Sequence, residues 1–227
     1  MAIYNARLTA IDPIETRRYA GLSKAANFDE RSIVEACEEA GLLIEVRGIW
    51  QMYDYDSARS MILSEPTVEI VGRSIEKHLS KCERVVCMAV TVGEAIEREV
   101  TSKFGGKEYV KAMLLDAAAT TAVEQAADQM EDVIRREVAR EGFSMRSRYS
   151  PGYGDWGLDQ QKELFRLTGA SEIGMRLSTA LMLMPRKSVT AIIGLTRSTV
   201  EKKSKHDCAS CDKVDCPMRD LDRKSVV

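Results

Sequence analysis

One short segment, residues 148–156, holds most of the residue types that could do chemistry. It contains Arg148, a proline, glycines and three aromatic residues, in a chain that is only 6% aromatic. Glycine accepts positive φ and lets a ligand approach the backbone, while Pro151 fixes one φ and removes a hydrogen-bond donor. Arg148 adds a planar, permanently charged guanidinium that can bind a carboxylate through two hydrogen bonds. The pattern predicts a site for a small carboxylate-bearing ligand; an ordinary turn around a packed tryptophan is the alternative.

A second candidate site lies near the C-terminus, at Cys208, Cys211 and Cys216. Three thiolates at this spacing can hold zinc or three irons of an iron–sulfur cluster. His206, a partner protein, Cys82 or Cys87 are the candidates for a fourth ligand. Reduced thiols without metal are the alternative interpretation. Cys37, Cys82 and Cys87 are themselves expected in the core, although the spacing of Cys82 and Cys87 leaves a redox pair open.

Composition narrows the class of protein. The chain has 227 residues, a net charge of −2 and 44% hydrophobic residues, and its acids and bases are well mixed. This balance argues against a general nucleic-acid or membrane-surface binder. The first twenty residues lack an apolar signal-peptide stretch, and the apolar runs are too short to cross a bilayer. Six cysteines without a secretion signal favour a reducing cytoplasm.

The elements that must position the first site are predicted from periodicity and from helix-capping residues. Residues 107–141 contain no Gly or Pro and predict one unusually long helix, Ala-rich at first and then charged and solvated. The residues from 85 to 92 predict a buried central strand. Shorter helices are expected at 12–21, 29–40 (ending at Gly41), 74–81, 93–104 and 158–167. Further strands are expected at 42–55, 67–71, 175–184 and 189–195, the last two joined as a hairpin by residues 185–188.

These elements predict an α+β fold with an antiparallel-rich sheet in residues 1–196, followed by a polar, Cys-bearing tail in residues 197–227. His78 is expected at the surface. The methionines of the 175–184 segment are expected to pack in the core. We find no Ser-His-Asp pattern, no phosphate-binding loop and no GxGxxG motif.

The order of the motifs resembles the activation (reactivation) domain of cobalamin-dependent methionine synthase. That family carries Arg-x-small-Pro-Gly-Tyr, and residues 148–153 read Arg-Tyr-Ser-Pro-Gly-Tyr. It also carries Met-Pro-x-x-Ser-Val, and residues 184–189 read Met-Pro-Arg-Lys-Ser-Val. Shorter similarities, such as residues 18–21 and 90–93, extend the resemblance over roughly residues 10–195.

The resemblance implies a curved sheet flanked by helices and a protein that binds S-adenosylmethionine. In that family, inactive cob(II)alamin takes one electron and the methyl group and returns to methylcobalamin, which serves methionine biosynthesis. This chain has no room for homocysteine, folate or cobalamin modules. The corrinoid is therefore expected on a separate methionine synthase module, and the electron is expected from a flavodoxin- or ferredoxin-like donor.

The resemblance also implies ligand contacts. Arg148 would bind the carboxylate of S-adenosylmethionine, the backbone of Ser150 and Gly152 would meet the adenine or ribose, and Tyr153 would pack on the cofactor or the corrin. Glu124, on the long helix, would bind the ammonium group. Asp116 and Asp128 are alternatives for that role, and a merely solvated acid is another interpretation. No side chain is expected to react covalently, because methyl transfer depends mainly on positioning.

Two departures from the family put the shape of the adenosine pocket in doubt. The family has Glu after a Leu-Thr pair, whereas residues 177–180 read Leu-Ser-Thr-Ala. Residues 191–194 read Ala-Ile-Ile-Gly and lack the aromatic residue found there in the full-length enzymes.

Three hypotheses follow. The first is an S-adenosylmethionine-binding methyltransferase component that reactivates a corrinoid methyltransferase by reductive methylation. The second is an iron–sulfur reductive activator of another corrinoid protein, which would use the C-terminal cysteines to deliver an electron. The third is a non-catalytic module that binds S-adenosylmethionine or clamps a partner.

Overall fold

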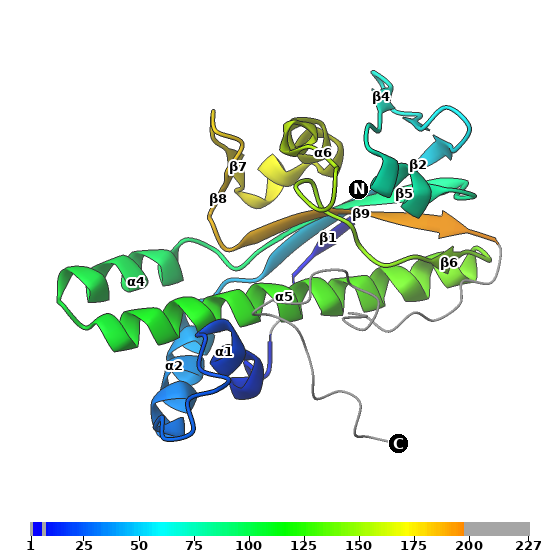
Figure 1. Ribbon diagram of the computed structural model, residues 1–227. Helices are drawn as coiled ribbons and strands as arrows, with labels where there is room; N and C mark the ends of the chain where they lie inside the picture. The colour runs from blue at the N-terminus through cyan, green and yellow to red at the C-terminus, as the bar shows by residue number, and fades with distance from the viewer. Residues whose placement is uncertain (1, 6–7, 198–227) are drawn as a thin grey trace.

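The computed structural model describes residues 2–5 and 8–197, which form an α+β fold around an antiparallel sheet (Figure 1). The seven strands run in the order β4-β3-β2-β5-β9-β6, and β1 also pairs with β2. Their bounds are β1 Ala2–Tyr4, β2 Arg47–Asp56, β3 Met61–Ile62, β4 Val68–Glu69, β5 Arg84–Thr91, β6 Ser144–Met145 and β9 Ser188–Thr196. The α+β class predicted from the sequence is confirmed. The C-terminal cysteines lie outside the described residues.

Strand β5 is the centre of the sheet, as the apolar run at residues 85–92 predicted. It pairs with β2 on one side and with β9 on the other, in antiparallel register over its full length. Every residue from Val85 to Thr91 is buried, because helices cover both faces of the sheet. A strand covered on both sides needs apolar side chains in both directions, which explains why its sequence does not alternate.

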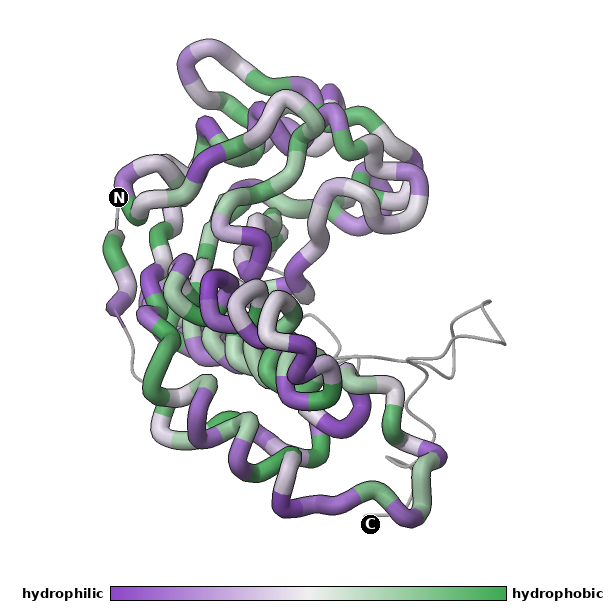
Figure 2. The backbone as a smooth tube through the Cα atoms, turned by 90° about the vertical axis from the view of Figure 1, so that its left-hand side faces the viewer, coloured by the Kyte–Doolittle hydropathy of each residue, from purple (hydrophilic) through white to green (hydrophobic). Residues whose placement is uncertain are grey.

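The predicted long helix is present as α5 (Tyr109–Arg140) and lies along one face of the sheet. Helices α1 (Pro13–Tyr19), α2 (Glu30–Leu43) and α4 (Ala95–Gly105) pack against it. Its alanines line the core on this face, where small side chains let neighbouring backbones approach closely. Apolar and polar residues alternate along the helices in Figure 2, as expected when each buries one side. No helix within residues 2–5 and 8–197 has both the length and the hydrophobicity needed to cross a membrane.

The opposite face of the sheet carries shorter elements. These are α3 (Arg73–Leu79), α6 (Gln161–Thr168), the 3-10 turns η1 (Leu158–Gln160) and η2 (Ala170–Ile173), and a two-stranded sheet of β7 (Arg176–Leu177) and β8 (Leu183–Met184). Trp156 is 1% exposed and packs in a second core cluster with Leu79 and Leu164. The indole therefore anchors the glycine-rich segment to this layer.

Most of the residues predicted to begin or end a helix do so, but Gly41 does not. The side chains of Asp12 and Asp29 accept hydrogen bonds from first-turn amides of α1 and α2, and Gly169 ends α6 in a left-handed conformation. Gly41 does not end α2, which continues to Leu43 because that residue packs against the core.

The predicted hairpin of residues 175–184 and 189–195 is also wrong. Residues 176–184 form their own small sheet, β7–β8, whereas β9 pairs with β5 and β6. Leu181 adopts φ +62° and the chain turns back between residues 178 and 181. Of the three methionines expected in the core, Met175 is buried, but Met182 and Met184 are exposed at 53% and 36%.

The second half of α5 is not simply solvated, contrary to expectation. Met130, Ile134 and Val138 recur every four residues and are buried, as is Glu131. This stripe follows helical periodicity. The surrounding charges obscured it in the sequence.

We expect Met88→Ala to lower the free energy of unfolding by about 2–5 kcal/mol, because it leaves a cavity between β5 and α5. Urea unfolding followed by circular dichroism measures the change. Leu42→Ala is the control, since that side chain is 88% exposed and its loss should change stability by less than about 0.5 kcal/mol. Equal effects of the two substitutions would contradict this account of the core.

Candidate functional site

The segment that carries Arg148 is held along the edge of the sheet before it turns. Strand β6 pairs with the end of β9. Further along, the backbone N–H of Tyr149 donates to the carbonyl of Ile192 at 2.9 Å, and the Ile192 N–H donates back at 2.8 Å. The chain is therefore fixed on both sides of Arg148.

The Pro-Gly-Tyr turn follows directly. The Gly152 N–H donates to the Trp156 carbonyl at 2.8 Å, with Gly152 at φ +90°. Gly154 has φ +55°, and a Cβ there would lie 2.6 Å from the hydroxyl oxygen of Tyr149. A side chain at Gly154 would therefore displace the tyrosine that supports the turn. The packed tryptophan of the alternative interpretation is present, while residues 152–155 of the turn are exposed.

Helix α3 holds this turn at two points. The Asp155 carboxylate accepts hydrogen bonds from the N–H groups of Arg73 and Ser74, at 3.0 and 2.9 Å. At the other end of α3, His78 Nε2 lies 2.8 Å from the Ser147 carbonyl oxygen. Burial lowers the pKa of His78, and the nearby Arg146 lowers it further against the effect of that carbonyl. His78, expected at the surface, is therefore a partly buried neutral ring whose Nε2–H donates to the segment.

Arg148 points at α5 and meets three carboxylates there. Its guanidinium lies 2.6 Å from Glu124, 2.6 Å from Asp128 and 2.7 Å from Glu131. These acids are four and three residues apart and so share one face of the helix. The Arg148 side chain is 15% exposed and that of Glu131 is 5% exposed. Burial alone would lower the pKa of Arg148, but the carboxylates outweigh it and raise this pKa above its usual value.

The structure thus brings Arg148 and Glu124 into direct contact, although the sequence suggested separate roles for them. Within these four residues the carboxylates outnumber the guanidinium by three to one, and Glu131 also lies 3.8 Å from Arg135. Glu131 is the buried member, whereas Glu124 and Asp128 are 35% and 44% exposed. These two outer acids can change partners at low cost, because ion pairs near water are weak. We name Arg148, Glu124, Asp128 and Glu131 the Arg148 cluster.

Two tyrosines lie beside Glu124. Partial burial raises the pKa of Tyr153, and the negative charge of Glu124 raises it further. The residue as a whole is still 58% exposed. Burial also raises the pKa of Tyr19, again with a contribution from Glu124. Tyr153 belongs to the Pro-Gly-Tyr turn and Tyr19 to α1, so two separate elements bring a tyrosine near the same carboxylate. Ser150 and Gly152 follow Arg148 in the segment that leads into the same turn.

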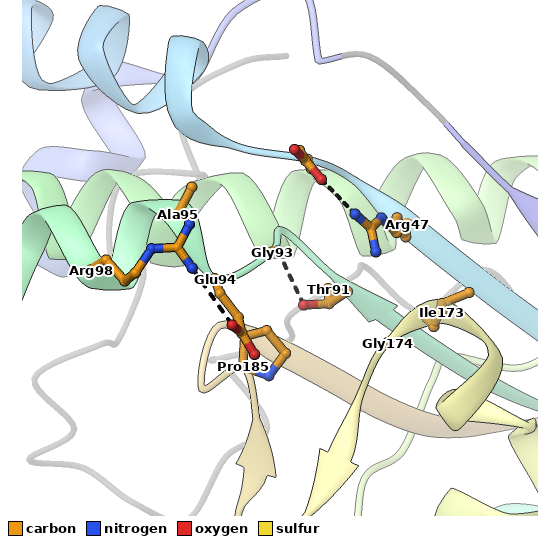
Figure 3. Close-up of a pocket in the computed structure, with 10 residues that line it drawn as sticks. Arg47, Thr91, Gly93, Glu94, Ala95, Arg98, Ile173, Gly174 and Pro185 are labelled. Carbon is orange, nitrogen blue, oxygen red and sulfur yellow. Dashed lines mark hydrogen bonds and ion pairs between the residues drawn. The ribbon is translucent and has the colours of Figure 1, made fainter.

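Two cavities lie near the loop of residues 185–188. A cavity of about 280 Å³ lies at the start of α4 and includes Pro185 in its wall (Figure 3). A larger cavity of about 450 Å³ lies between α1, α4 and α5 and includes Tyr19, Asp116 and Thr120. Because Thr120 and Glu124 are one helical turn apart, the larger cavity and the Arg148 cluster share one face of α5.

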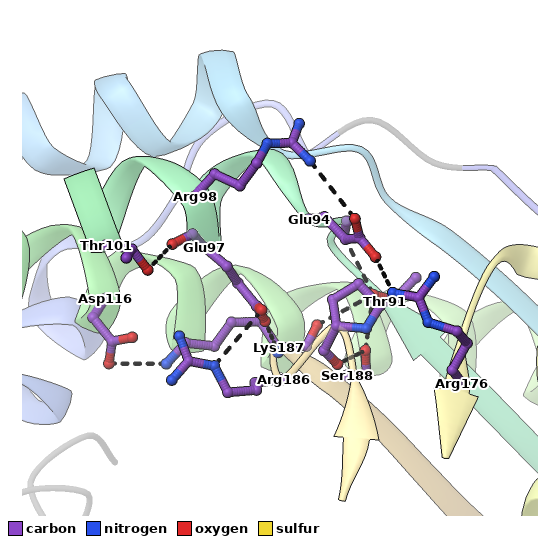
Figure 4. A network of polar contacts seen from close by, with 12 residues as sticks. Thr91, Glu94, Glu97, Arg98, Thr101, Asp116, Arg176, Arg186, Lys187 and Ser188 are labelled. Atoms are coloured by element: carbon purple, nitrogen blue, oxygen red, sulfur yellow. Dashed lines mark hydrogen bonds and ion pairs between the residues drawn. The ribbon is translucent and has the colours of Figure 1, made fainter. Parts of the chain in front are cut away.

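Lys187 fixes the loop to α5 at the larger cavity. Its ammonium lies 2.9 Å from the Asp116 carboxylate and donates to the Thr120 hydroxyl at 2.8 Å (Figure 4). The Lys187 N–H donates to Glu97 at 2.8 Å. Asp116 and Asp128 were the alternative acids for a ligand ammonium. Asp116 is paired with Lys187, whereas Asp128 belongs to the Arg148 cluster.

Sequence reasoning missed Tyr19, Glu131 and Lys187 as members of this region. A signal existed for Glu131, because it lies seven residues after Glu124 and so on the same helix face. Tyr19 and Lys187 lie in stretches that carried the family resemblance, but the approach of α1 and of the loop to α5 is a tertiary contact that no local pattern reveals.

The described residues contain no group of three or more His, Cys, Asp or Glu side chains arranged to hold a metal ion. Cys37, Cys82 and Cys87 are buried free thiols, and burial raises the pKa of Cys87 far above its usual value. A thiol enclosed in this way is poorly placed to serve as a fourth ligand for the C-terminal cysteines. Those cysteines and His206 lie outside the described residues.

The fold is similar to the "Crystal Structure of the MetH Reactivation Domain bound to AdoHcy". The superposition has a TM-score of 0.59 and covers 89% of this chain and 81% of that chain, at 14% sequence identity. No protein-family model and no curated protein matches the sequence. The likeness is therefore one of fold, and it agrees with the architecture that the sequence motifs implied.

We expect Asp155→Asn to weaken the attachment of the turn to α3. Backbone hydrogen bonds from Ser74 are the main cause that lowers the pKa of Asp155 below its ordinary 3.8. A carboxyl group whose pKa is lower in the folded state stabilises the fold at pH values above its unfolded-state pKa. This contribution is lost as the pH falls through its folded-state pKa. The stability difference between wild type and Asp155→Asn should therefore be largest at neutral pH and shrink between pH 5 and pH 3.

Urea unfolding at a series of pH values measures this difference. Asp159→Asn, which removes a carboxylate from the same segment, is the control for the change in net charge. A difference that is constant across the pH range would contradict the proposed role of the Asp155 charge.

Proposed function

We propose that this protein binds S-adenosylmethionine at the Arg148 cluster and helps to reactivate a corrinoid-dependent methyltransferase, namely a methionine synthase that lacks this domain. The observation that carries the proposal is the contact between Arg148 and Glu124, 2.6 Å apart, which joins the Pro-Gly-Tyr segment to α5. The pair offers one positive and one negative group at the surface, as the amino-acid end of the ligand requires. The fold likeness to a domain bound to AdoHcy supports the same class of ligand.

The amino-acid end of S-adenosylmethionine can enter the cluster by exchange of ion pairs. Its carboxylate would take the guanidinium of Arg148 in a bidentate pair, and its ammonium would take Glu124 and Asp128. Buried Glu131, 2.7 Å from the guanidinium, would stay in place and hold Arg148 in position. Every charge keeps a partner in this exchange, so the cost of opening the cluster is offset by the new pairs.

The adenosine and sulfonium parts of the ligand would contact backbone groups of the Pro-Gly-Tyr turn and the rings of two tyrosines. The backbone of Ser150 and Gly152 would meet adenosine, as the open side of the Pro-Gly-Tyr turn allows. Tyr153 and Tyr19 flank Glu124 and can pack against the sulfonium through their ring faces. The larger cavity, about 450 Å³ in volume and including Tyr19 and Thr120, extends the site along α5 and is in the size range of small-molecule pockets.

The chain's part in the reaction would be to aim the methyl group. A cobalamin held by a partner module would accept the methyl group together with one electron from a flavodoxin- or ferredoxin-like donor and leave S-adenosylhomocysteine in the site. The sulfonium would point outward, because its amino-acid end is fixed at Arg148 and Glu124. Positioning of this kind can supply a large part of the rate enhancement without any covalent step by the protein.

A non-catalytic module that senses S-adenosylmethionine would use the same cluster and cavity, and turnover separates it from the reactivator. An iron–sulfur activator would depend instead on a cluster held by Cys208, Cys211 and Cys216, whereas zinc at these cysteines would be a structural site without redox chemistry. The assay is transfer of labelled methyl from S-adenosylmethionine to a corrinoid protein with an added reductant. Binding without turnover would favour the sensor, and visible cluster absorbance with no ligand binding would favour the activator.

We expect calorimetry to detect S-adenosylmethionine binding and Glu124→Gln to weaken it at least about tenfold, because one charge-assisted hydrogen bond contributes about 1.5–3 kcal/mol. Glu137→Gln, an exposed residue on the same helix, is the matched control and should bind like wild type. Arg148→Lys should also weaken binding, because it keeps the charge but loses the planar fork. No binding by the folded wild type at millimolar ligand would refute both the reactivator and the sensor.

We also expect S-adenosylmethionine to bind about fivefold more tightly than S-adenosylhomocysteine, which lacks the sulfonium charge, given about 1 kcal/mol for one extra charge contact in water. The excess negative charge of the cluster is the cause. The preference for S-adenosylmethionine over S-adenosylhomocysteine should decrease when salt is added. It should also be smaller in the Glu124→Gln variant. An equal affinity for both ligands at low salt would show that the cluster does not attract the sulfonium.

A further inference from the structure

The smaller cavity, at the start of α4, has no part in the proposed ligand site. Its volume is about 280 Å³, and Arg47, Thr91, Gly93 and Arg98 are in its wall (Figure 3). None of the four residues of the Arg148 cluster lines it. Its wall carries two arginines, Arg47 and Arg98, and two glutamates, Glu45 and Glu94, which sets it apart from the larger cavity with its aromatic and aliphatic side chains.

Arginines from separate elements converge on this cavity. Arg47 comes from β2 and Arg98 from α4, so the two are far apart in sequence. Arg176, from β7, reaches the rim and lies 2.7 Å from Glu94 (Figure 4). Three guanidinium groups brought together by the fold are a typical arrangement for binding an oxyanion, because each presents several N–H donors in one plane.

The nearby acids do not cancel this charge. Glu45 lies 2.5 Å from Arg47, and Glu94 pairs with both Arg176 and Arg98. The two glutamates of the wall balance its two arginines, and Arg176, which is paired with Glu94, adds one positive charge beside the wall. The Arg98–Glu94 contact is 3.6 Å long, and the Arg98 side chain is 72% exposed. Exposed pairs of this kind are worth little, so Arg98 can turn to an incoming anion at small cost.

Two features of the backbone also favour an anion in this cavity: a glycine without a side chain and the N-terminus of a helix. Gly174 has φ +80°, and a Cβ there would lie 3.3 Å from a terminal nitrogen of Arg47. The missing side chain therefore leaves the guanidinium access to the cavity. Helix α4 begins at the wall with Ala95, and Glu94, its N-cap residue, makes no side-chain capping hydrogen bond. The positive end of the helix reinforces the arginines.

We propose that this cavity binds a phosphate group, between Arg47 and Arg98, either as the free ion or as a phosphate monoester. Phosphate suits the site better than a carboxylate, because it carries more charge and has oxygens enough for both guanidinium forks. The volume also exceeds that of a bare ion, since a water molecule occupies about 30 Å³ of liquid, and so leaves space for a small esterified group.

The test is a titration of the full chain with inorganic phosphate at pH 7, followed by ¹H–¹⁵N NMR, with sodium chloride added at matched ionic strength as the blank. We expect saturable shifts at the amides of Gly93 and Ala95, with a Kd below about 5 mM. Methyl phosphate should bind at the same amides if an ester is accepted, and acetate should bind at least about tenfold more weakly.

Arg47→Gln should weaken phosphate binding about tenfold or more, as expected for the loss of a charge-assisted hydrogen bond. Arg59→Gln is the matched control, since Arg59 is an 82% exposed arginine that follows the opposite end of β2 from Arg47, and it should leave the Kd unchanged. Shifts that stay linear up to high phosphate, equal binding of acetate, or an Arg47→Gln variant that binds like wild type would each overturn the proposal. None of these results would bear on S-adenosylmethionine binding, which is measured at different residues.

Discussion

The Arg148 cluster connects two parts of the chain that the sheet alone would leave independent. Arg148 belongs to the segment that follows the edge strand β6, and its three partners belong to α5 on the layer behind. Taking a guanidinium out of water is costly unless carboxylates and good geometry compensate. Buried Glu131 provides the permanent compensation, and the more exposed Glu124 and Asp128 provide a part that a ligand can replace. The same arrangement therefore serves to hold the turn and to offer a charged surface.

The rest of the fold keeps this cluster in place. The alanines on α5 let the helix lie close to the sheet, so that its acidic face reaches the edge where residues 144–149 run. On the other side of the segment, Trp156 is buried and α3 binds Ser147 and Asp155. A segment fixed in this way loses little conformational freedom when a ligand binds, which favours affinity.

Much of the fold could be predicted from the sequence, because it depends on local patterns. The uninterrupted helix of α5, the apolar run of β5 and the caps at Asp12 and Asp29 are each visible within a few residues. The β7–β8 sheet could not be predicted, because Leu181 takes a left-handed conformation that no glycine or asparagine signals. The apolar stripe of α5 beyond Met130 was hidden among charged residues.

The residues of the candidate site could be chosen from the sequence, but their contacts with one another could not. Arg148, Glu124 and Tyr153 could be chosen from the motif and the helix face, and the structure brings them together. Their pairing with one another, and the presence of Tyr19 and Lys187, depend on how α1 and the loop of residues 185–188 pack on α5. The contact between Lys187 and Thr120 joins residues 67 positions apart, so neither periodicity nor spacing encodes it.

The most direct measurement of the central claim is a crystal structure of this protein with S-adenosylmethionine. The account predicts that the ligand carboxylate lies on the Arg148 guanidinium and its ammonium on Glu124, with the Arg148–Glu131 pair retained. A ligand bound elsewhere while all three ion pairs of Arg148 stay intact would contradict it.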